Sequence, residues 1–356
     1  MNIYINARFL TQAITGVQRF SIELCKELVE IRSDLVFLVP DLDLVLDKSL
    51  LKKINILEVK GGSGHYWEQF ILPKFLKNQG SPLLLNLGNT APVLYKNKIF
   101  THHDITYIRF PESYSLKFRL IYRLMAFLNF KNSLSFITVS NFSKNDISDF
   151  YNVNMDNIHV LYNGVNSKFK KNENKIFNHD KPFALAVSSP SYHKNFSALI
   201  DAFNKIDNPI ELKIIGSSTR VFKNLKNHEA NPNIEFLGRI SDDELIELYQ
   251  TAEFFIFPSL YEGFGIPPLE AQACGCPVIS SNAASLPEVL GDSAYYFDPK
   301  DVNSIRNAIL EVMDNSLLRE SLKNSGLNNI LRFSWKKSAL SLNSILNNLQ
   351  ENLSDE

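Results

Sequence analysis

Two glutamates that frame a glycine-containing loop have the residue types and spacing for ligand chemistry. Glu262 is followed at once by Gly263, Phe264 and Gly265, and Glu270 comes after seven intervening residues. A carboxylate accepts hydrogen bonds from sugar hydroxyls, whereas backbone N–H groups at a helix N-terminus attract phosphate. This loop therefore predicts a ligand that contains both a sugar and a phosphate. The alternative is structural, because a carboxylate in the first turn of a helix, where Glu270 is expected, also complements the helix dipole, by about 0.3–1 kcal/mol.

The loop is predicted to lie between a buried strand and a helix. Phe254–Phe257 is a short apolar run, which is typical of a buried strand. Pro267 and Pro268 stand where a helix can begin, because its first turn needs no N–H donor from them. Gly275 is placed to end that helix, and the next strand is expected at Val278–Ser280. These elements would present the backbone N–H groups of the loop to a ligand.

Three other loops follow expected strands and add further candidates. Lys194, after His193, stands just before a helix, where a cation opposes the helix dipole unless an anion is bound. We therefore expect Lys194 to bind phosphate, with a solvated surface lysine as the alternative. Gly216 opens a turn of small residues that would let the base of a ligand approach the backbone. Arg239 follows the next strand, and its partner is either a phosphate or a surface carboxylate.

A pair of histidines follows the strand expected at Ile99–Thr101. His102 and His103 would share a metal only if both pointed to one place, but neighbouring strand residues point to opposite faces. A single histidine at the strand tip that reaches a sugar hydroxyl is the preferred interpretation. Asp41 and Asp43 form a DxD pattern, which is either a motif for a metal-bound nucleotide diphosphate or a solvated turn. No neighbouring feature supports the metal, so a turn is expected.

Composition restricts the class of protein. The chain has 356 residues, of which 45% are hydrophobic and 21% charged, so it is long enough for two globular domains. Its net charge of -1 argues against a nucleic-acid partner. Three cysteines give neither a disulfide framework nor a zinc-binding spacing. The N-terminus does not resemble a signal peptide, and no apolar run approaches the roughly 18–20 residues that span a bilayer, so a cytoplasmic location is expected.

Strands and helices alternate twice along the chain. The first series of strands is expected at Ile3–Asn6, Leu35–Val39, Ile54–Val59, Leu83–Leu87, Ile99–Thr101, Phe136–Val139 and Val160–Tyr162. The second series is expected at Phe183–Val187, Leu212–Ile215, Ile234–Leu237, Phe254–Phe257, Val278–Ser280 and Tyr295–Phe297. Helices between the strands include Val17–Ile31, Phe196–Ile206 and Asp242–Thr251. Such alternation is typical of α/β folds with parallel sheets, whose ligands bind at the carboxyl ends of the strands.

The chain is therefore predicted to fold as two doubly wound, Rossmann-like domains that face a cleft. The expected divisions are a first domain over residues 1–165, a linker over 166–181, a second domain over 182–334 and a final segment over 335–356. The linker is polar and rich in lysine and asparagine. Ser241 and Glu244 have the spacing of a capping box, so their role is structural.

The block PSLYEGFGIPPLEAQACGCPVISSNAASLPEVLGDSAYYFDP resembles the donor-site signature of glycosyltransferase family 4, which contains retaining enzymes of the GT-B architecture. Its most specific mark is the pair Glu262 and Glu270 with seven residues between them. Supporting blocks extend over most of the chain and read ITGVQRF, HHDITYI, TVSNFSKNDI, YNGV, and HKN followed by LIDAF. The resemblance implies a GT-B fold, in which the last helix, expected at Trp335–Leu349, returns to the first domain.

The resemblance also implies roles for the residues of the glycine loop. Glu262 would contact the hydroxyls of the donor sugar near the reacting face. The amides of Gly263, Phe264 and Gly265 would approach the sugar and the phosphate. Glu270 would hold the ribose hydroxyls of the donor.

Other matching residues would surround the leaving group and the acceptor. Lys194 would neutralise the diphosphate. His103 would lie by the donor sugar and the acceptor, and Gly16 would let its loop come close to the same place. Arg239 and Ile240 would lie by the nucleotide, with the backbone of Ile240 contacting the base.

One departure from the family concerns basic residues. Many members place an arginine just before the lysine, or in a Gly-Arg pair at the strand end, where this chain has His193 and Ser188–Ser189. The charge of the leaving group would then rest on Lys194 with help from Arg239. No metal would be required, because Lys194 and the helix N-termini supply positive potential.

The implied reaction moves a hexose from a UDP-, GDP- or dTDP-linked donor to a saccharide, in O-antigen, capsule or other surface-polysaccharide synthesis. Two alternatives remain, a GT-B nucleotide-sugar 2-epimerase and a non-catalytic nucleotide-sugar binder. Tyr114–Phe136 mixes four cations with many aromatic residues, as do helices that lie on anionic membranes. A lipid-linked acceptor and contact with the cytoplasmic face of the inner membrane would follow from that interpretation. The other interpretation is a core helix with its lysines outward.

Overall fold

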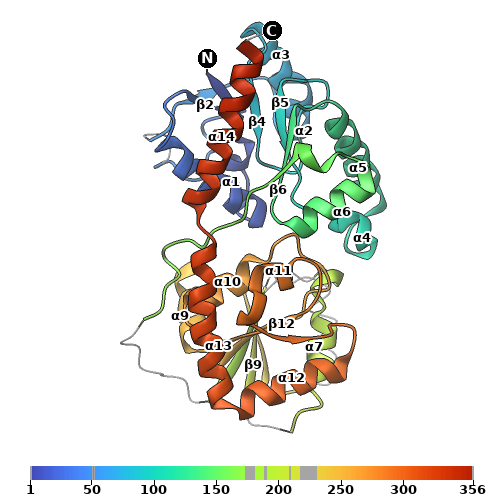
Figure 1. Ribbon diagram of the computed structural model, residues 1–356, viewed down its shortest axis with the longest axis vertical. Helices are drawn as coiled ribbons and strands as arrows, with labels where there is room; N and C mark the ends of the chain where they lie inside the picture. Colours follow the sequence, from blue (N-terminus) through green and yellow to red (C-terminus); the bar gives the residue numbers. More distant parts are fainter. Residues whose placement is uncertain are drawn as a thin grey trace. The chain divides into compact units, whose positions relative to one another are not determined.

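The computed structural model describes residues 2–49, 51, 53–172, 181–187, 191–207, 210–216 and 231–354. The chain divides into two compact units (Figure 1). Unit 1 comprises Met1–Asn163 and Ser334–Glu356, and unit 2 comprises Gly164–Phe333. Each unit has a parallel sheet and a hydrophobic core of its own.

Unit 1 is built on a seven-stranded parallel sheet with the strand order β3-β2-β1-β4-β5-β6-β7. Its strands are β1 (Ile3–Asn6), β2 (Leu35–Val39), β3 (Ile56–Glu58), β4 (Leu84–Asn86), β5 (Lys98–Thr101), β6 (Ser135–Thr138) and β7 (Ile158–Val160). Its α-helices are α1 (Gly16–Val29), α2 (Gly64–Tyr66), α3 (Leu72–Asn78), α4 (Thr106–Arg109), α5 (Leu116–Lys131), α6 (Asn141–Tyr151) and α14 (Trp335–Ser354). A π-helical segment, Trp67–Ile71, joins α2 to α3.

The apolar patterns of these elements explain their burial. All five residues of β2 are apolar and buried, as is typical of a parallel strand that is covered on both faces of its sheet. α1 buries Phe20, Leu24 and Leu28, which recur with the helical period. The start of α1 is closed by a capping box between Thr15 and Gln18.

Unit 2 has a six-stranded parallel sheet with the strand order β10-β9-β8-β11-β12-β13. Its strands are β8 (Phe183–Val187), β9 (Glu211–Ile215), β10 (Ile234–Gly238), β11 (Phe254–Phe257), β12 (Val278–Ser281) and β13 (Tyr295–Phe297). Its α-helices are α7 (Phe196–Phe203), α9 (Asp242–Thr251), α10 (Ile266–Ala273), α11 (Leu286–Leu290), α12 (Val302–Asp314) and α13 (Ser316–Asn329). α7 and α12 pack together and share one hydrophobic core with the central strands. The two sheets confirm the prediction of two doubly wound, Rossmann-like domains.

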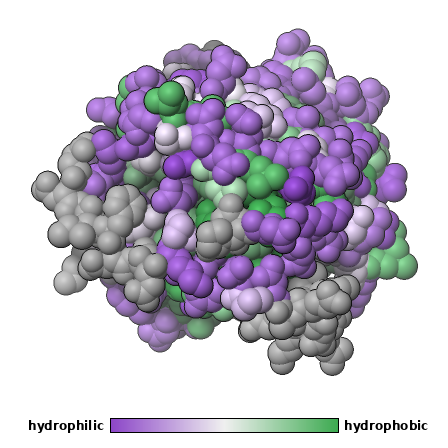
Figure 2. Space-filling model, turned by 90° about the horizontal axis from the view of Figure 1, so that it is seen from below, coloured by the Kyte–Doolittle hydropathy of each residue, from purple (hydrophilic) through white to green (hydrophobic). Residues whose placement is uncertain are grey.

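Because the apolar side chains are mostly buried within the units, the surface is mostly polar. The face drawn in Figure 2 is mostly hydrophilic, and apolar atoms are visible there only in limited areas. Among the described residues, no helix has the combined length and hydropathy that a membrane crossing requires.

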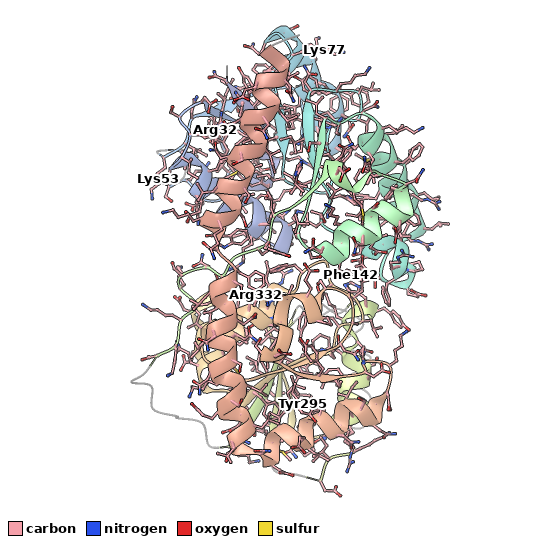
Figure 3. The ribbon with its side chains drawn as sticks, viewed as in Figure 1. Arg32, Lys53, Lys77, Phe142, Tyr295 and Arg332 are labelled. Atoms are coloured by element: carbon pink, nitrogen blue, oxygen red, sulfur yellow. The ribbon has the colours of Figure 1, made fainter. Side chains whose placement is uncertain are left out.

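The last helix belongs to unit 1, as the GT-B resemblance implied. α14 packs along α1, and the two lie side by side in Figure 1. At its start, the Trp335 ring lies 5.9 Å from the ring of Phe20. Farther along, Arg32 donates hydrogen bonds to Asn343 (2.9 Å) and Gln350 (2.6 Å), and Figure 3 shows Arg32 beside this helix. These contacts return the end of the chain to the first domain.

Several predicted boundaries differ from the structure, and β7 and α7 show why. β7 begins two residues before the predicted strand, because its first residue pairs with Phe136 of β6. α7 ends at Phe203 rather than at Ile206, since the chain continues in a tighter turn. There the N–H of Ile206 bonds to the carbonyl of Phe203 at 3.0 Å, three residues back rather than four.

Part of the predicted linker packs against unit 2. Residues 166–172 belong to that unit, and Phe169 is buried with its ring 6.2 Å from the ring of Tyr249 in α9. One buried phenylalanine thus anchors a segment that its polar composition assigned to a linker. Residues 173–180 of the predicted linker lie outside the described part of the chain.

Each sheet reverses its strand order at one place. In unit 1 the reversal falls between β1 and β4, and in unit 2 between β8 and β11. The two crossover connections leave a reversal point on opposite faces of the sheet, so a crevice opens there at the carboxyl ends of the strands. These two places are therefore where ligands are expected to bind, one in each unit.

Candidate functional site

The glycine loop stands at the reversal point of unit 2, after β11. Gly265 is the N-cap of α10 and has φ = 90°, a conformation that side chains of L-residues rarely adopt. A Cβ atom at Gly265 would also lie only 2.7 Å from Cδ2 of Leu286. Pro267 and Pro268 fall in the first turn of α10, as predicted. The glycine is thus required by backbone conformation and by packing.

Lys194 and Glu262 form an ion pair at this reversal point. Lys194 Nζ lies 2.6 Å from Glu262 Oε1 and 5.9 Å from the centroid of the Phe257 ring. The side chains of Lys194 and Glu262 are 17% and 13% exposed, so the pair is sheltered but reachable from solvent. Sequence reasoning found both residues, but assigned them to separate ligand groups and did not predict their direct contact.

Hydrogen bonds around Asn195 hold Lys194 in place. Asn195 adopts the left-handed conformation, with φ = 59°, after the 3-10 turn that contains Lys194. Its side-chain amide donates to the carbonyls of Pro258 (3.2 Å) and Pro299 (2.7 Å). The carbonyl of the buried His193 accepts from the N–H of Leu260 at 2.7 Å. The loop after β8 is therefore tied to the loop after β11.

Ser285 fixes the backbone of the glycine loop from the other side. Its buried hydroxyl lies 2.9 Å from the carbonyl of Glu262 and 3.1 Å from the carbonyl of Phe264. Sequence reasoning did not identify Ser285 or Asn195 as site residues. A serine in a small-residue stretch has no local signal of such a role, because its partners lie more than twenty residues away.

Glu270 lies deeper in α10 than predicted. The helix begins at Ile266, so Glu270 is in its second turn, and its first turn contains no acidic residue. Glu270 is buried, with 6% of its surface exposed. The effect of a helix dipole falls off within the first turn, so complementing the dipole does not explain this carboxylate.

The nucleotide-side candidates stand at the carboxyl ends of the outer strands. Gly216 follows β9, and its N–H donates to the carbonyl of Gly238 at 2.9 Å. The rest of the small-residue turn after Gly216 lies outside the described part of the chain. Arg239 directly follows β10 and is exposed, and Ile240 is half-buried before the cap of α9. The predicted capping box at Ser241 and Glu244 is confirmed.

His103 in unit 1 is held as a neutral imidazole. Its Nε2 lies 3.0 Å from the carbonyl of Leu87, which can only accept, so Nε2 bears the proton. The neutral ring therefore has its acceptor at Nδ1. The ring packs 4.8 Å from Phe20, and the backbone N–H donates to Asn89 Oδ1 at 2.9 Å. Burial lowers the pKa of His103, which favours the neutral form.

His102 packs as a core residue. Its Nε2 lies 3.1 Å from the hydroxyl of Tyr107, and its ring packs against Phe100 and Phe130. Burial lowers the pKa of His102 to about 3. Within the described ranges, no group of three or more histidine, cysteine or acidic residues is placed to hold a metal ion.

Gly16 is the first residue of α1 in unit 1. A Cβ atom at Gly16 would meet no atom within 4 Å, so nothing in the described structure of the unit requires a glycine there. The structure thus brings Lys194 and Glu262 together in unit 2 and places Gly16 and His103 in unit 1.

Models of two protein families match successive parts of the chain. The family described as Glycosyltransferase Family 4 matches residues 14–169. The family described as Glycosyl transferases group 1 matches residues 167–328. Together these matches cover residues 14–328, which include most of both units.

Individual proteins resemble the chain along most of its length. O-antigen chain mannosyltransferase B of Escherichia coli is 29% identical over 379 residues, which cover 94% of this chain and 97% of that protein. O-antigen chain mannosyltransferase RfbU of Salmonella typhimurium is 32% identical over 252 residues, 69% of each chain. The crystal structure of HepE from Anabaena, in complex with UDP and glucose, has a TM-score of 0.77 at 17% identity, covering 98% of this chain and 100% of that one.

The structural likeness confirms the predicted GT-B architecture, and the family matches confirm the resemblance found in the sequence. This chain belongs to the family 4 glycosyltransferases.

Proposed function

We propose that this glycosyltransferase moves a hexose from a nucleotide diphosphate sugar to a saccharide acceptor in surface-polysaccharide synthesis, with retention of configuration. The names of two relatives, both O-antigen mannosyltransferases, support mannose as the sugar. The observation that supports a donor site most directly is the Lys194–Glu262 pair at the reversal point of unit 2. It combines a cation for phosphate with a carboxylate for hydroxyl groups.

In this proposal Lys194 binds the phosphate part of the donor, and Glu262 binds its sugar. The ammonium of Lys194 has three N–H donors, of which Glu262 takes one, so the others can reach phosphate oxygens. Glu262 accepts hydrogen bonds from hydroxyls of the donor sugar. The amides of Gly263, Phe264 and Gly265 approach the sugar and the phosphate, in a loop that Ser285 holds in shape.

The nucleoside is assigned to the other residues at the same sheet edge. The buried carboxylate of Glu270 binds the ribose hydroxyls. The exposed guanidinium of Arg239 assists with the diphosphate, and the backbone of Ile240 contacts the base. Gly216 gives the base access to the backbone, and the buried His193 holds the Lys194 loop through its carbonyl.

The transfer step needs no protein carboxylate as a nucleophile. The acceptor oxygen forms a bond to the anomeric carbon on the face from which the diphosphate leaves. The bond between that carbon and the phosphate oxygen breaks, and the departing oxygen takes the hydroxyl proton. Lys194 stabilises the charge on the diphosphate. Nδ1 of His103 positions the acceptor hydroxyl, and Gly16 lets its loop come close to that hydroxyl. Catalysis is then positioning and electrostatic stabilisation, with no metal required.

Calorimetric titration of the full chain with UDP, GDP and dTDP tests the donor assignment. We expect one base to bind in preference to the others, with the same affinity in EDTA as without it. At a ligand concentration of about 100 times Kd, the gain in stability is about 2.7 kcal/mol, which a thermal-shift assay detects. A chain that binds none of the three would contradict the donor site. Loss of nucleotide binding in EDTA would contradict metal independence. A product whose anomeric configuration, determined by proton NMR, is opposite to that of the donor would contradict retention.

α5 supports the proposal that the enzyme contacts a membrane. Leu116, Leu120, Leu124 and Phe127 are 64%, 59%, 58% and 42% exposed, and their spacing places them along one face of the helix. α5 buries Ala126 and Asn129, and its Phe130 packs against a core cluster of unit 1, so one side of the helix covers the core while this stripe is exposed. Its cations are Lys117, Arg119, Arg123 and Lys131. An apolar stripe with cations beside it suits the interface of an anionic bilayer and a lipid-linked acceptor.

Co-sedimentation with vesicles of phosphatidylglycerol and phosphatidylethanolamine tests this contact. We expect Leu120→Glu with Leu124→Glu to reduce the bound fraction strongly, because two charges would enter the apolar stripe. Leu317→Glu is the matched control, since Leu317 is 84% exposed on α13 of unit 2. A wild-type chain that stays in the supernatant at low salt would refute membrane contact.

A further inference from the structure

Unit 1 contains an apolar cavity of about 450 Å³ beside α1, on the face of the sheet that α1 covers. Phe37 of β2 lines it, whereas its neighbours Val36 and Leu38 pack on the other face with Leu72 and Leu76 of α3. The second half of α1, the turn after β1 and the segment that leads into β3 complete the lining. The volume lies within the range of small-molecule sites, about 300–1,000 Å³.

The cavity lies where a doubly wound sheet ordinarily has a crossover helix. The strand order β3-β2-β1 continues in one direction, so right-handed connections from β1 to β2 and from β2 to β3 run over the same face. α1 makes the first of these connections. The described residues of the second, between Val39 and Ile56, include no α-helix. This part of the sheet therefore lacks the neighbouring helix that would fill the space beside α1.

The walls of the cavity are apolar and largely shielded from solvent. Phe9, Leu10 and Phe37 are buried, and Ile22 and Val29 are half-buried one above the other on α1. Protein interiors have few voids larger than a water molecule, so an apolar space of this size is unusual in a packed unit. A hydrocarbon chain suits the space, because binding would remove the apolar area of both the chain and the walls from water.

Lys53 places an ammonium at the mouth of the cavity. It lines the cavity from the segment that leads into β3, and it is exposed at the outer edge of unit 1 (Figure 3). Asp47 lies within electrostatic range of Lys53, but accepts instead from the hydroxyl and the N–H of Ser49, at 2.6 and 3.0 Å. Within the described ranges Lys53 forms no ion pair, so its ammonium is available to an anionic group.

Glu30 places a carboxylate among the exposed residues of the same lining. It is the C-cap of α1, where the negative end of the helix dipole disfavours an anion. Lys26, one turn earlier in the helix, is paired with Glu23 at 2.8 Å rather than with Glu30. Glu30 has no ion-pair partner in the part of the chain that the structure describes, so its carboxylate is available to a cationic group.

We propose that this cavity binds a single-chain amphiphile with a zwitterionic phosphodiester head, such as a lysophospholipid. The hydrocarbon chain lies over Phe37, the phosphate meets the ammonium of Lys53, and the terminal cation of the head meets the carboxylate of Glu30. A neutral or purely anionic head would leave at least one of these two charges without a partner, so complementarity selects the zwitterion. The site is separate from the donor site, because its lining residues all belong to unit 1.

Calorimetric titration of the full chain with decylphosphocholine, below the concentration at which it forms micelles, tests the site. Ile22→Phe and Val29→Phe each put a ring into the cavity, so the affinity should fall by about 10-fold or more. Lys53→Met and Glu30→Gln change exposed residues and should each lower the affinity by about 2- to 5-fold. Leu317→Phe, a surface change on α13 of unit 2, is the matched control and should leave the affinity unchanged.

Decanoate tests the assignment of the head, because it has the chain and an anion but no cation. Lys53→Met should weaken the binding of both decylphosphocholine and decanoate. Glu30→Gln should weaken only decylphosphocholine, since decanoate has no group for Glu30 to bind. Weaker decanoate binding in Glu30→Gln, or unchanged decylphosphocholine binding in both variants, overturns the zwitterionic head.

Folding is followed in the same samples. Both tryptophans, Trp67 and Trp335, lie in unit 1, so their fluorescence reports whether that unit is folded in each variant. A wild-type chain that does not bind decylphosphocholine overturns the site. Unchanged affinity in folded Ile22→Phe and Val29→Phe also overturns it.

Two further outcomes would locate the amphiphile elsewhere. Competition between decylphosphocholine and a nucleoside diphosphate would overturn the site, since the nucleotide is assigned to unit 2. Loss of decylphosphocholine binding in Leu120→Glu with Leu124→Glu would place the hydrocarbon chain on the exposed stripe of α5, and would equally overturn the cavity as its site.

Discussion

Replacing Lys194 by methionine tests the central electrostatic claim about the donor. Methionine keeps most of the apolar stem of the lysine but removes the cation that lies 2.6 Å from Glu262. A hydrogen bond from a charged group contributes about 1.5–3 kcal/mol, so the Kd for a nucleoside diphosphate should rise about 10- to 150-fold. Loss of one donor to a developing oxyanion lowers kcat by about 10²–10³-fold. Calorimetry gives the affinity, and release of nucleoside diphosphate gives kcat.

Lys213 supplies a matched control for this substitution. It also lies in unit 2, with Nζ 3.8 Å from Glu235 and 4.6 Å from the centroid of the Phe183 ring. Its side chain is 13% exposed, close to that of Lys194, but it is within β9 rather than at the carboxyl edge. Lys213→Met should therefore leave nucleotide affinity and kcat unchanged.

Glu262→Gln separates the cation from its partner. The variant leaves Lys194 charged and removes the competing carboxylate, so nucleoside diphosphate affinity should hold or increase. At the same time kcat should fall, because the amide that replaces the Glu262 carboxylate accepts weaker hydrogen bonds from the donor sugar.

The assignment of Lys194 to the leaving group would be refuted if Lys194→Met kept both the nucleoside diphosphate affinity and kcat within threefold of wild type.

Three further predictions concern the supports of the fold and the site. Gly265→Ala should lower stability by about 1–3 kcal/mol in thermal unfolding, because its φ is positive and its Cβ would meet Leu286 at 2.7 Å; an unchanged Tm would contradict this. Ser285→Ala should lower kcat/KM with a loss of about 1 kcal/mol in stability, because the loop carbonyls of Glu262 and Phe264 lose their donor; full activity would show that the loop needs no such support. Burial lowers the pKa of Lys98 to about 7, against about 10.4 in an unfolded chain, so the unfolded chain binds more protons between these values. Urea unfolding followed by tryptophan fluorescence should therefore show the stability of unit 1 rising from pH 7 to 9, by up to roughly 1.4 kcal/mol per pH unit, and Lys98→Met should remove that rise.

Much of the local structure could be predicted from residue patterns alone. β2, β8, β11 and β13 have the predicted bounds, because each is a compact apolar run with polar or turn-forming residues on both sides. The capping box at Ser241 and the proline start of α10 were likewise predicted, since both depend on residues within a few positions of each other. The family resemblance rested on the same loop, whose glutamate spacing is a property of the sequence.

The contacts that make the donor site were decided by tertiary structure. Lys194 and Glu262 are 68 residues apart, so no local pattern relates them. The pair forms where a parallel sheet reverses its strand order, because helical crossovers bring loops that are distant in sequence to one edge. That order is set by how the whole sheet buries its two faces. The sequence therefore determined which residues could do the chemistry, and the order of the strands decided which of them meet.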